Sequence, residues 1–267
     1  MTLRYGGNTF SYMWNRPIEP ALAELTELGL NDFDVILSPG HLWPEELDGP
    51  ARDALKKRLH SSGVRLESLN PPALDYNLGS VDHEVRASSV RLYERALELA
   101  ADLDVKGVVV VPGRVSGLFP PPSEQTMSRL EDSIGALATL AGKFGLRLHL
   151  ETHPLTSLPS ASQIKGFIER LGLNALGVAY DLANAEFIGE DQAVAIGNLG
   201  PLLSQLHVSD GRRGAWRHDA LGTGTVDFKA AFAAAEQIRF TGIAVLELIS
   251  GQPREAFVQS LAYLHSL

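Results

Sequence analysis

The sequence predicts a single α/β domain, a (β/α)8 TIM barrel spanning residues 1–267. Short apolar runs alternate with longer amphipathic segments eight times, and this strict alternation indicates parallel strands. The length of 267 residues fits, because barrels of this type have about 250 residues. Four of the apolar runs end at an acidic residue or a histidine, as expected where strand ends meet at the mouth of a barrel.

The predicted strands are the eight apolar runs, several of which stop at turn residues. Ser38-Pro39-Gly40 follows the second run, Asn70-Pro71-Pro72 the third and Pro112-Gly113 the fourth. No G-x-G-x-x-G follows the first run, which disfavours a dinucleotide-binding open sheet. The predicted strands cover residues 3–10, 33–37, 64–69, 105–111, 146–151, 176–181, 203–208 and 243–248.

Apolar residues recur every three to four positions between the strands, as on the buried face of a helix. Pro17 suits a first helical turn, Ser160 with Gln163 has the pattern of a capping box, and Asp227 can cap the helix after it. A Gly-rich loop is expected from 208 to 227, with Gly222-Thr223-Gly224 as a turn or, alternatively, a phosphate cradle. The first predicted helix follows Pro17, and a weaker one begins at about residue 191. The other predicted helices cover 51–61, 80–103, 127–141, 160–171, 228–238 and 253–267.

Composition narrows the possible partners and compartments. The net charge is −9 with no basic cluster, which disfavours nucleic acid and anionic membranes as partners. The chain has no cysteine, so disulfides, thiol catalysis and Cys-type zinc sites are excluded. No apolar run is long enough for a signal peptide or a membrane span, and we expect a cytoplasmic protein.

Four predicted strands carry a potential metal ligand at the C-terminal end: Glu151, Asp181, His207 and Glu247. Because strand side chains alternate between faces, all four fall on the inner face, with bulky apolar neighbours such as Leu150 outside. Three nearby carboxylates would repel one another unless a cation offset their charge. This oxygen-rich set suits Mn²⁺ or Mg²⁺, with Zn²⁺ or Co²⁺ as alternatives. The competing interpretation is four solvated strand ends.

These residues resemble those of the sugar phosphate isomerase/epimerase superfamily, the xylose isomerase-like TIM barrels, over nearly the whole chain. The resemblance implies that Glu151, Asp181, His207 and Glu247 bind one divalent metal. It implies a metal-dependent isomerase or epimerase of a small sugar or keto-sugar that acts through an enediolate. In such an enzyme the two glutamates are catalytic: one removes a proton next to a carbonyl, and the other returns it from the opposite face. The similar segments are 109–113, Leu150-Glu151-Thr152-His153-Pro154, Tyr180-Asp181, His207-Val208-Ser209-Asp210, Leu221-Gly222-Thr223-Gly224 with Asp227-Phe228, and Leu246-Glu247.

The chain also departs from the family pattern. Members often have Asp-x-x-His after the sixth strand, where this chain has Asn184, and ketose epimerases have a second glutamate near Ser157. These departures keep open a dehydratase (lyase) acting on an inosose- or dehydroshikimate-like substrate, and a non-catalytic sugar-binding barrel is a third possibility. Trp216 stands where related multi-zinc endonucleases have a ligand, which disfavours a nuclease. No strand ends at lysine, which disfavours a Schiff-base aldolase.

The resemblance suggests a homo-oligomer. Further residues are candidates to bind a sugar or cyclitol substrate. Arg217 and His218 can hold substrate oxygens or a carboxylate, and Asn184 can bond a hydroxyl. Trp14, together with Trp43, can form an apolar wall against a sugar ring. His153 can lie beside the metal, and Asn8 and Asn70 are weaker candidates. For each residue the alternative is an ordinary loop or core residue.

Overall fold

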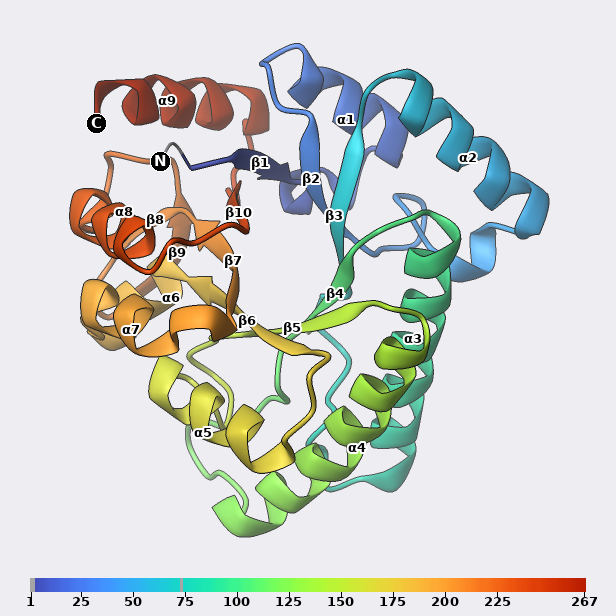
Figure 1. The fold of residues 1–267 in the computed structure, drawn as a ribbon, viewed down its shortest axis with the longest axis vertical. Coiled ribbons are helices and arrows are strands. Elements are labelled where there is room, and N and C mark those ends of the chain that lie inside the picture. The colour runs from blue at the N-terminus through green and yellow to red at the C-terminus, as the bar shows by residue number, and fades with distance from the viewer. Residues whose placement is uncertain (1–2, 73) are drawn as a thin grey trace.

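Eight parallel strands close into one barrel with helices around the outside (Figure 1). The structure is a computed structural model that describes residues 3–72 and 74–267. Each barrel strand pairs with the next along the chain, and the last returns to β1, so the predicted barrel is confirmed. The strands are β1 Tyr5–Asn8, β2 Asp32–Ile36, β3 Arg65–Asn70, β4 Gly107–Val110, β5 Arg147–Glu151, β6 Leu176–Asp181, β7 Leu203–Val208 and β10 Ile243–Leu246.

The helices between these strands begin and end close to their predicted positions. The capping box of Ser160 and Gln163 forms as predicted, and Asp227 accepts a hydrogen bond from the Ala230 backbone N–H. The described part of the chain contains the α-helices α1 Ile18–Thr26, α2 Gly49–Ser61, α3 His83–Asp102, α4 Ser123–Lys143, α5 Ala161–Leu171, α6 Leu182–Ile188, α7 Gln192–Leu199, α8 Phe228–Gln237 and α9 Pro253–Ser266. Short 3-10 helices cover Phe10–Tyr12, Pro44–Glu46 and Gly200–Leu202.

The two faces of the strands differ as the alternation predicts. Outward-facing residues form one hydrophobic core with the helices, and Gln205 on the inner face bonds Ser68 across the barrel interior. In the register, Asp181 lies opposite His207, and His207 lies opposite Val245. The outward-facing members of this core include Leu148, Leu150, Val178, Tyr180, Leu206, Val208, Leu246 and Leu248.

Helix α6 and a β-hairpin were not predicted from the sequence. Helix α6 begins directly after β6, because the Asp181 carboxylate accepts the Asn184 backbone N–H and caps the helix. The expected Gly-rich loop contains a hairpin of β8 Asp210–Arg212 and β9 Ala215–Asp219. The two strands are short and the segment contains glycines, so the alternating pattern of a strand cannot be recognised in its sequence.

The turn at Gly222-Thr223-Gly224 wraps around a carboxylate of the protein itself. Asp210 accepts hydrogen bonds from the backbone N–H groups of Gly211, Gly222 and Val226. A Cβ atom at Gly224 would lie 2.2 Å from Asp210 Oδ1, so only glycine fits there. The sequence-based interpretation as a turn is therefore correct, and these amides connect the start of the hairpin to the segment that precedes helix α8.

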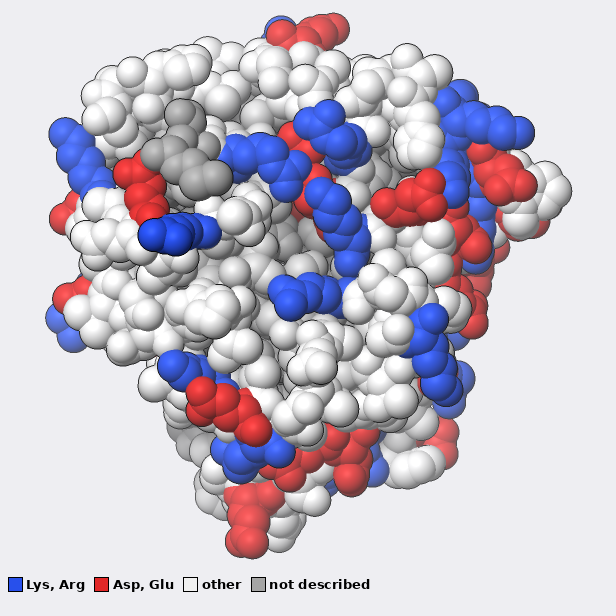
Figure 2. Space-filling model, viewed as in Figure 1, with Lys and Arg blue, Asp and Glu red and all other residues white. Residues whose placement is uncertain are grey.

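Charged residues close the N-terminal end of the barrel. Glu67 accepts hydrogen bonds from Arg4 at 2.7 Å and from Lys106 at 2.8 Å, while Asp32 pairs with Arg65 at 2.7 Å. On the face shown in Figure 2, Lys and Arg gather around the centre, and Asp and Glu lie mostly nearer the edges. None of the described helices combines the length and apolar character needed to cross a membrane.

Candidate metal centre and active site

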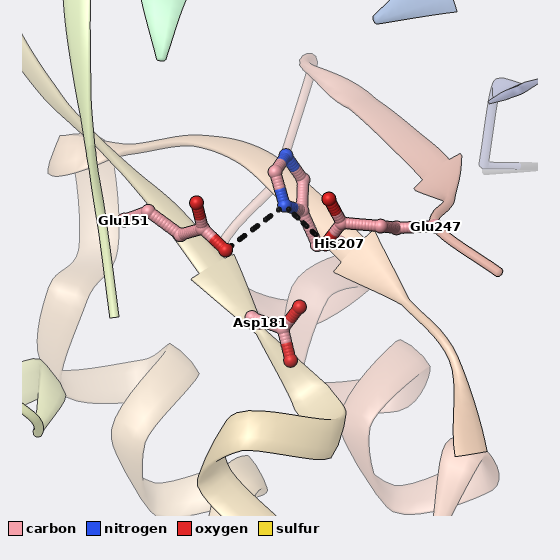
Figure 3. Close-up of side chains that lie close together, drawn as sticks. All are labelled: Glu151, Asp181, His207 and Glu247. Carbon is pink, nitrogen blue, oxygen red and sulfur yellow. Dashed lines mark hydrogen bonds and ion pairs between the residues drawn. The ribbon is translucent and has the colours of Figure 1, made fainter. Parts of the chain in front are cut away.

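Four side chains converge at the C-terminal ends of neighbouring strands: Glu151, Asp181, His207 and Glu247 (Figure 3). Each offers one ligand-type atom, and these atoms all lie within 4.8 Å of one another. His207 Nδ1 lies 3.0 Å from Glu247 Oε2 and 3.5 Å from Glu151 Oε1. The residues come from β5, β6, β7 and the residue after β10, strands that are consecutive around the barrel. The closed sheet therefore brings together four residues spread over about a third of the chain.

The donor set fits a divalent cation. All four residues are buried, with exposed fractions of 5 % or less. Within the described residues, Asp181 Oδ2 is a buried polar atom of this group without a hydrogen-bond partner. Unpaired buried polar atoms are costly, and three carboxylates around one imidazole match the oxygen-rich coordination of hard divalent metals. This buried group can hold one metal ion.

Crowding shifts the pKa values of these residues in the metal-free protein. Burial, and then the Glu247 charge, raises the pKa of Glu151 to about 7 and raises the pKa of Asp181 well above its usual range. Burial alone would lower the pKa of His207, but the surrounding carboxylates raise it well above its ordinary value. Burial likewise opposes the shift at Glu247, but the charge and hydrogen bond of His207 lower that pKa to about 2. The cluster thus retains protons that a divalent cation can replace.

A cavity of about 500 Å³ opens beside the four residues at the C-terminal end of the barrel. Glu151 and Glu247 line it, so both glutamates are accessible to a bound molecule. Its apolar walls come from the loops after several strands, and four predicted substrate-binding residues reach it. The apolar lining is Phe10, Pro72, Leu74, Val111, Trp216 and Ile249, and the four predicted residues are His153, Asn184, Arg217 and His218.

Trp14, the fifth predicted substrate-binding residue, is not brought to the cavity. It lies after the 3-10 helix Phe10–Tyr12, is 74 % exposed, and is not among the residues that line the cavity. Trp43 is half-buried and packs against the hydrophobic core. Neither tryptophan lines the cavity, whereas Trp216 does. The expected apolar wall comes from a different tryptophan.

The hairpin β8–β9 carries Arg217 and His218 to the cavity in different ways. The His218 side chain is 9 % exposed, with Nδ1 lying 3.6 Å from Asp181 Oδ2 and 3.7 Å from Glu247 Oε2. Arg217 is mostly exposed and donates to Asp219 Oδ1 at 2.8 Å, so it lies at the cavity rim. His218 is thus adjacent to the metal cluster, and Arg217 is accessible to the outer part of a substrate.

Asn184 has most of its hydrogen-bonding capacity taken by the protein. Its Oδ1 accepts from the Trp216 indole N–H at 2.7 Å, and its Nδ2 donates to the Thr152 carbonyl at 3.0 Å. The Trp216 ring also contacts the His153 ring edge-on, with centroids 4.9 Å apart. Asn184 therefore holds Trp216 in the cavity wall, and one side-chain N–H remains for a substrate.

Two residues near the cluster were not predicted from the sequence: Trp216, which lines the cavity, and Asp34, which lies 3.8 Å from His207 Nε2. In the sequence Trp216 stands out only as a departure from a nuclease ligand set, and its approach to the cavity depends on the unpredicted hairpin. Asp34 is fully buried inside the barrel and lies among the strand residues Phe33 and Val35. A charged residue at an inward position of an apolar strand was the signal that could have identified it.

The Trp216→Phe variant should lose the bond to Asn184 but keep an aromatic ring in the wall. The buried Asn184 oxygen then lacks a donor, and we expect a loss of about 1–3 kcal/mol in the free energy of unfolding. The KM for substrate should rise with little change in kcat, because the wall positions the substrate. Trp14→Phe is the matched control and should change neither thermal stability nor KM. Equal behaviour of the two variants would contradict a role for Trp216.

Comparison with known proteins agrees with this architecture. L-ribulose-5-phosphate 3-epimerase UlaE of Escherichia coli (strain K12) is 23 % identical over 229 residues, covering 85 % of this chain and 78 % of that protein. A D-tagatose 3-epimerase-like protein has a TM-score of 0.85 at 18 % identity, covering 99 % of this chain and 96 % of the other. The 3-keto-D-glucoside 4-epimerase YcjR from E. coli has a TM-score of 0.81 at 20 % identity, with full coverage of both chains.

A third similar structure is that of the IOLI protein with a bound zinc atom. Its TM-score is 0.84 at 17 % identity, covering 99 % of this chain and 97 % of the other. At these identities the structural likeness establishes the fold. The sequence pattern of the family described as xylose isomerase-like TIM barrel matches residues 22–267, nearly the whole chain. The chain therefore belongs to the xylose isomerase-like TIM barrel family.

Proposed function

We propose that this protein is a divalent-metal-dependent sugar epimerase or isomerase that moves a proton at the carbon next to a carbonyl. The observation that carries the proposal is the position of Glu151 and Glu247, which belong to the metal-binding group and also line the cavity. Two carboxylates facing one substrate pocket supply the two bases that proton transfer on both faces of a carbon requires. The similarity to sugar 3- and 4-epimerases supports this reaction class.

Each residue has a definite part in the proposed reaction. Glu151 and Glu247 remove and return the proton on opposite faces of the substrate carbon, and which one acts as base depends on the epimer bound. A divalent cation held by the cluster would polarise the substrate carbonyl and stabilise the negative charge left by proton removal. His218 and Asn184 offer hydrogen bonds to substrate hydroxyls, Trp216 packs on the ring, and Arg217 contacts the outer end.

For the metal we propose Mn²⁺ or Mg²⁺. Three carboxylates and one imidazole form a hard donor set without thiolates, and such sets favour these ions. Zn²⁺ and Co²⁺ are alternatives, and the related IOLI protein has a bound zinc atom. The proposed substrate is a small sugar or cyclitol, which a cavity of about 500 Å³ can accommodate. Cytoplasmic location and homo-oligomerisation stay predictions from the sequence.

A dehydratase (lyase) is the second candidate function, favoured by the state of Asn184. Where many relatives have histidine, this side chain cannot carry a proton and is bonded to Trp216 and Thr152. An inosose- or dehydroshikimate-like substrate carries a hydroxyl on the carbon adjacent to the one that loses its proton. That hydroxyl could leave after the proton is removed. A non-catalytic sugar-binding barrel is the third candidate, and the accessible pair of glutamates argues against it.

Proton exchange with solvent distinguishes the three candidates. The Mn²⁺-loaded protein is incubated in D₂O with L-ribulose, its 5-phosphate, D-tagatose, a 3-keto-glucoside, an inosose and dehydroshikimate, and each product is followed by NMR. We expect deuterium at the carbon next to the carbonyl, together with the epimer, for at least one sugar. An enone or diketone product would support the lyase. Binding without exchange for every compound would support the sugar-binding barrel.

A further inference from the structure

A second polar cluster lies beside the metal centre, on the β1–β3 side of the barrel interior, and is centred on Asp34. Asp34 is fully buried and does not line the cavity. Its Oδ2 accepts from Asn8 Nδ2 at 2.6 Å and from Asn70 Nδ2 at 3.0 Å, and its Oδ1 accepts from the Ser68 hydroxyl. A buried carboxylate is costly without such partners, and since these three donors are neutral, the charged group that can offset Asp34 is His207.

The first link from Asp34 to the metal centre is through His207. His207 Nδ1 faces Glu151 and Glu247, whereas Nε2 lies 3.8 Å from Asp34 Oδ2. Nε2 has no hydrogen-bond partner anywhere in residues 3–72 and 74–267. A neutral imidazole carries one N–H and one lone pair, so a ring that presents its Nδ1 lone pair to a metal must carry the proton on Nε2. That proton faces Asp34.

The second link is through Asn8. Its Nδ2 donates to Asp34 Oδ2 at 2.6 Å and to Glu247 Oε1 at 3.3 Å, so one amide bridges the two carboxylates. The orientation of this amide is determined by its surroundings, because Asn8 Oδ1 accepts from the Phe10 backbone N–H at 2.6 Å. A flipped amide would place its oxygen against two carboxylates. Asn8 therefore holds the Glu247 oxygen that does not bond His207.

We propose that Asp34 is a positioning residue for the metal centre, which fixes the Nε2-protonated form of His207 and, through Asn8, the orientation of Glu247. This inference rests on the proposed metal-dependent function, since it assigns a role toward the ion that the four ligands would hold. Asp34 touches neither the cavity nor the substrate, and its effect passes through two ligands. Partners of this kind orient metal ligands, and their loss commonly weakens metal binding about 10–100-fold.

The test is Mn²⁺ binding to metal-depleted protein, measured by isothermal titration calorimetry. Asp34→Asn is nearly isosteric but neutral, so in either orientation of the amide it removes the negative charge that accepts from Asn8 and faces His207. We expect its Kd for Mn²⁺ to rise about 10–100-fold with an unchanged circular dichroism spectrum. Ser133→Ala is the matched control: it removes a buried hydroxyl that donates to the Leu78 carbonyl, outside both the Asp34 cluster and the metal centre, so its Kd should equal that of the wild type.

Asn8→Ala is the second variant and should also weaken Mn²⁺ binding, because it removes the amide that joins Asp34 to Glu247 and leaves the approach of Asp34 to His207 in place. If Asp34→Asn does not fold, Asn8→Ala decides alone. Wild-type Kd values in the folded variants, or an equal rise in Ser133→Ala, would overturn the inference. Absence of Mn²⁺ binding by the wild-type protein would instead count against the proposed function, so the two failures are distinguishable.

Discussion

Replacing Glu151 or Glu247 by glutamine should lower the epimerisation rate on the order of 10³-fold, within the range that general acid–base catalysis supplies. Glutamine keeps the size and one ligand-type oxygen of each glutamate but cannot accept the substrate proton. Both variants should fold, because each amide replaces a carboxylate within an already polar cluster. Glu131→Gln, which alters only an exposed ion pair with Arg170, should keep full activity.

The two variants should differ in the proton exchange that survives. With two bases on opposite faces, loss of one base stops epimerisation, but the other base can still exchange the proton of the epimer that presents it. Glu151→Gln should therefore exchange deuterium into one epimer only, and Glu247→Gln into the other only. NMR of each pure epimer in D₂O measures this directly. Loss of exchange from both epimers in one variant, with normal exchange in the other, would show a single-base mechanism.

Asp181→Asn should have opposite effects on metal binding and on the stability of the metal-free protein. Its amide oxygen can still cap helix α6 through the Asn184 N–H, while the unpartnered Oδ2 becomes an NH₂ group that cannot bind a cation. Loss of a direct ligand should weaken Mn²⁺ binding by more than the ~10–100-fold that is typical when a residue that only orients a ligand is lost. The metal-free variant should melt at a higher temperature than the wild type, because a repelled buried carboxylate has been removed.

The rise in melting temperature caused by Mn²⁺ should depend on pH, and the direction of that dependence follows from the pKa values. The pKa of Glu151 is raised from 4.5 to about 7 in the metal-free fold, so its contribution to stability is full below pH 4.5 and is lost as the pH rises through about 7. Asp181 shifts in the same direction. Bound metal removes this loss, since both groups bind it as carboxylates. The rise in melting temperature on adding Mn²⁺ should therefore grow between about pH 5 and pH 7.5.

A chelator series completes this test. EDTA should lower the melting temperature and abolish proton exchange at pH 7.5, and Mn²⁺ should restore both. In Asp181→Asn the same treatment should change the melting temperature little. A wild-type protein whose stability and exchange do not respond to EDTA or Mn²⁺ would contradict the assignment of the four residues as a metal centre.

The sequence by itself determined the barrel and the composition of its metal cluster. Both depend on short-range regularities: alternation of faces along each strand, repeated βα units, and a ligand-type residue at four strand ends. A closed parallel barrel converts these regularities into proximity, so Glu151, Asp181, His207 and Glu247 could be expected to meet. The capping residues Ser160 and Asp227 were predictable for the same reason, because their partners lie within three residues.

Only the tertiary structure decided how the site is walled and supported. Trp216 replaces Trp14 in the wall because a hairpin in the Gly-rich segment carries it to Asn184, 32 residues away in the chain. Asn8 meets Glu247 across 239 residues, and Asp34 approaches His207 from the other side of the barrel interior. Such contacts follow from how the sheet closes and how its loops return, and no local pattern of residues encodes them.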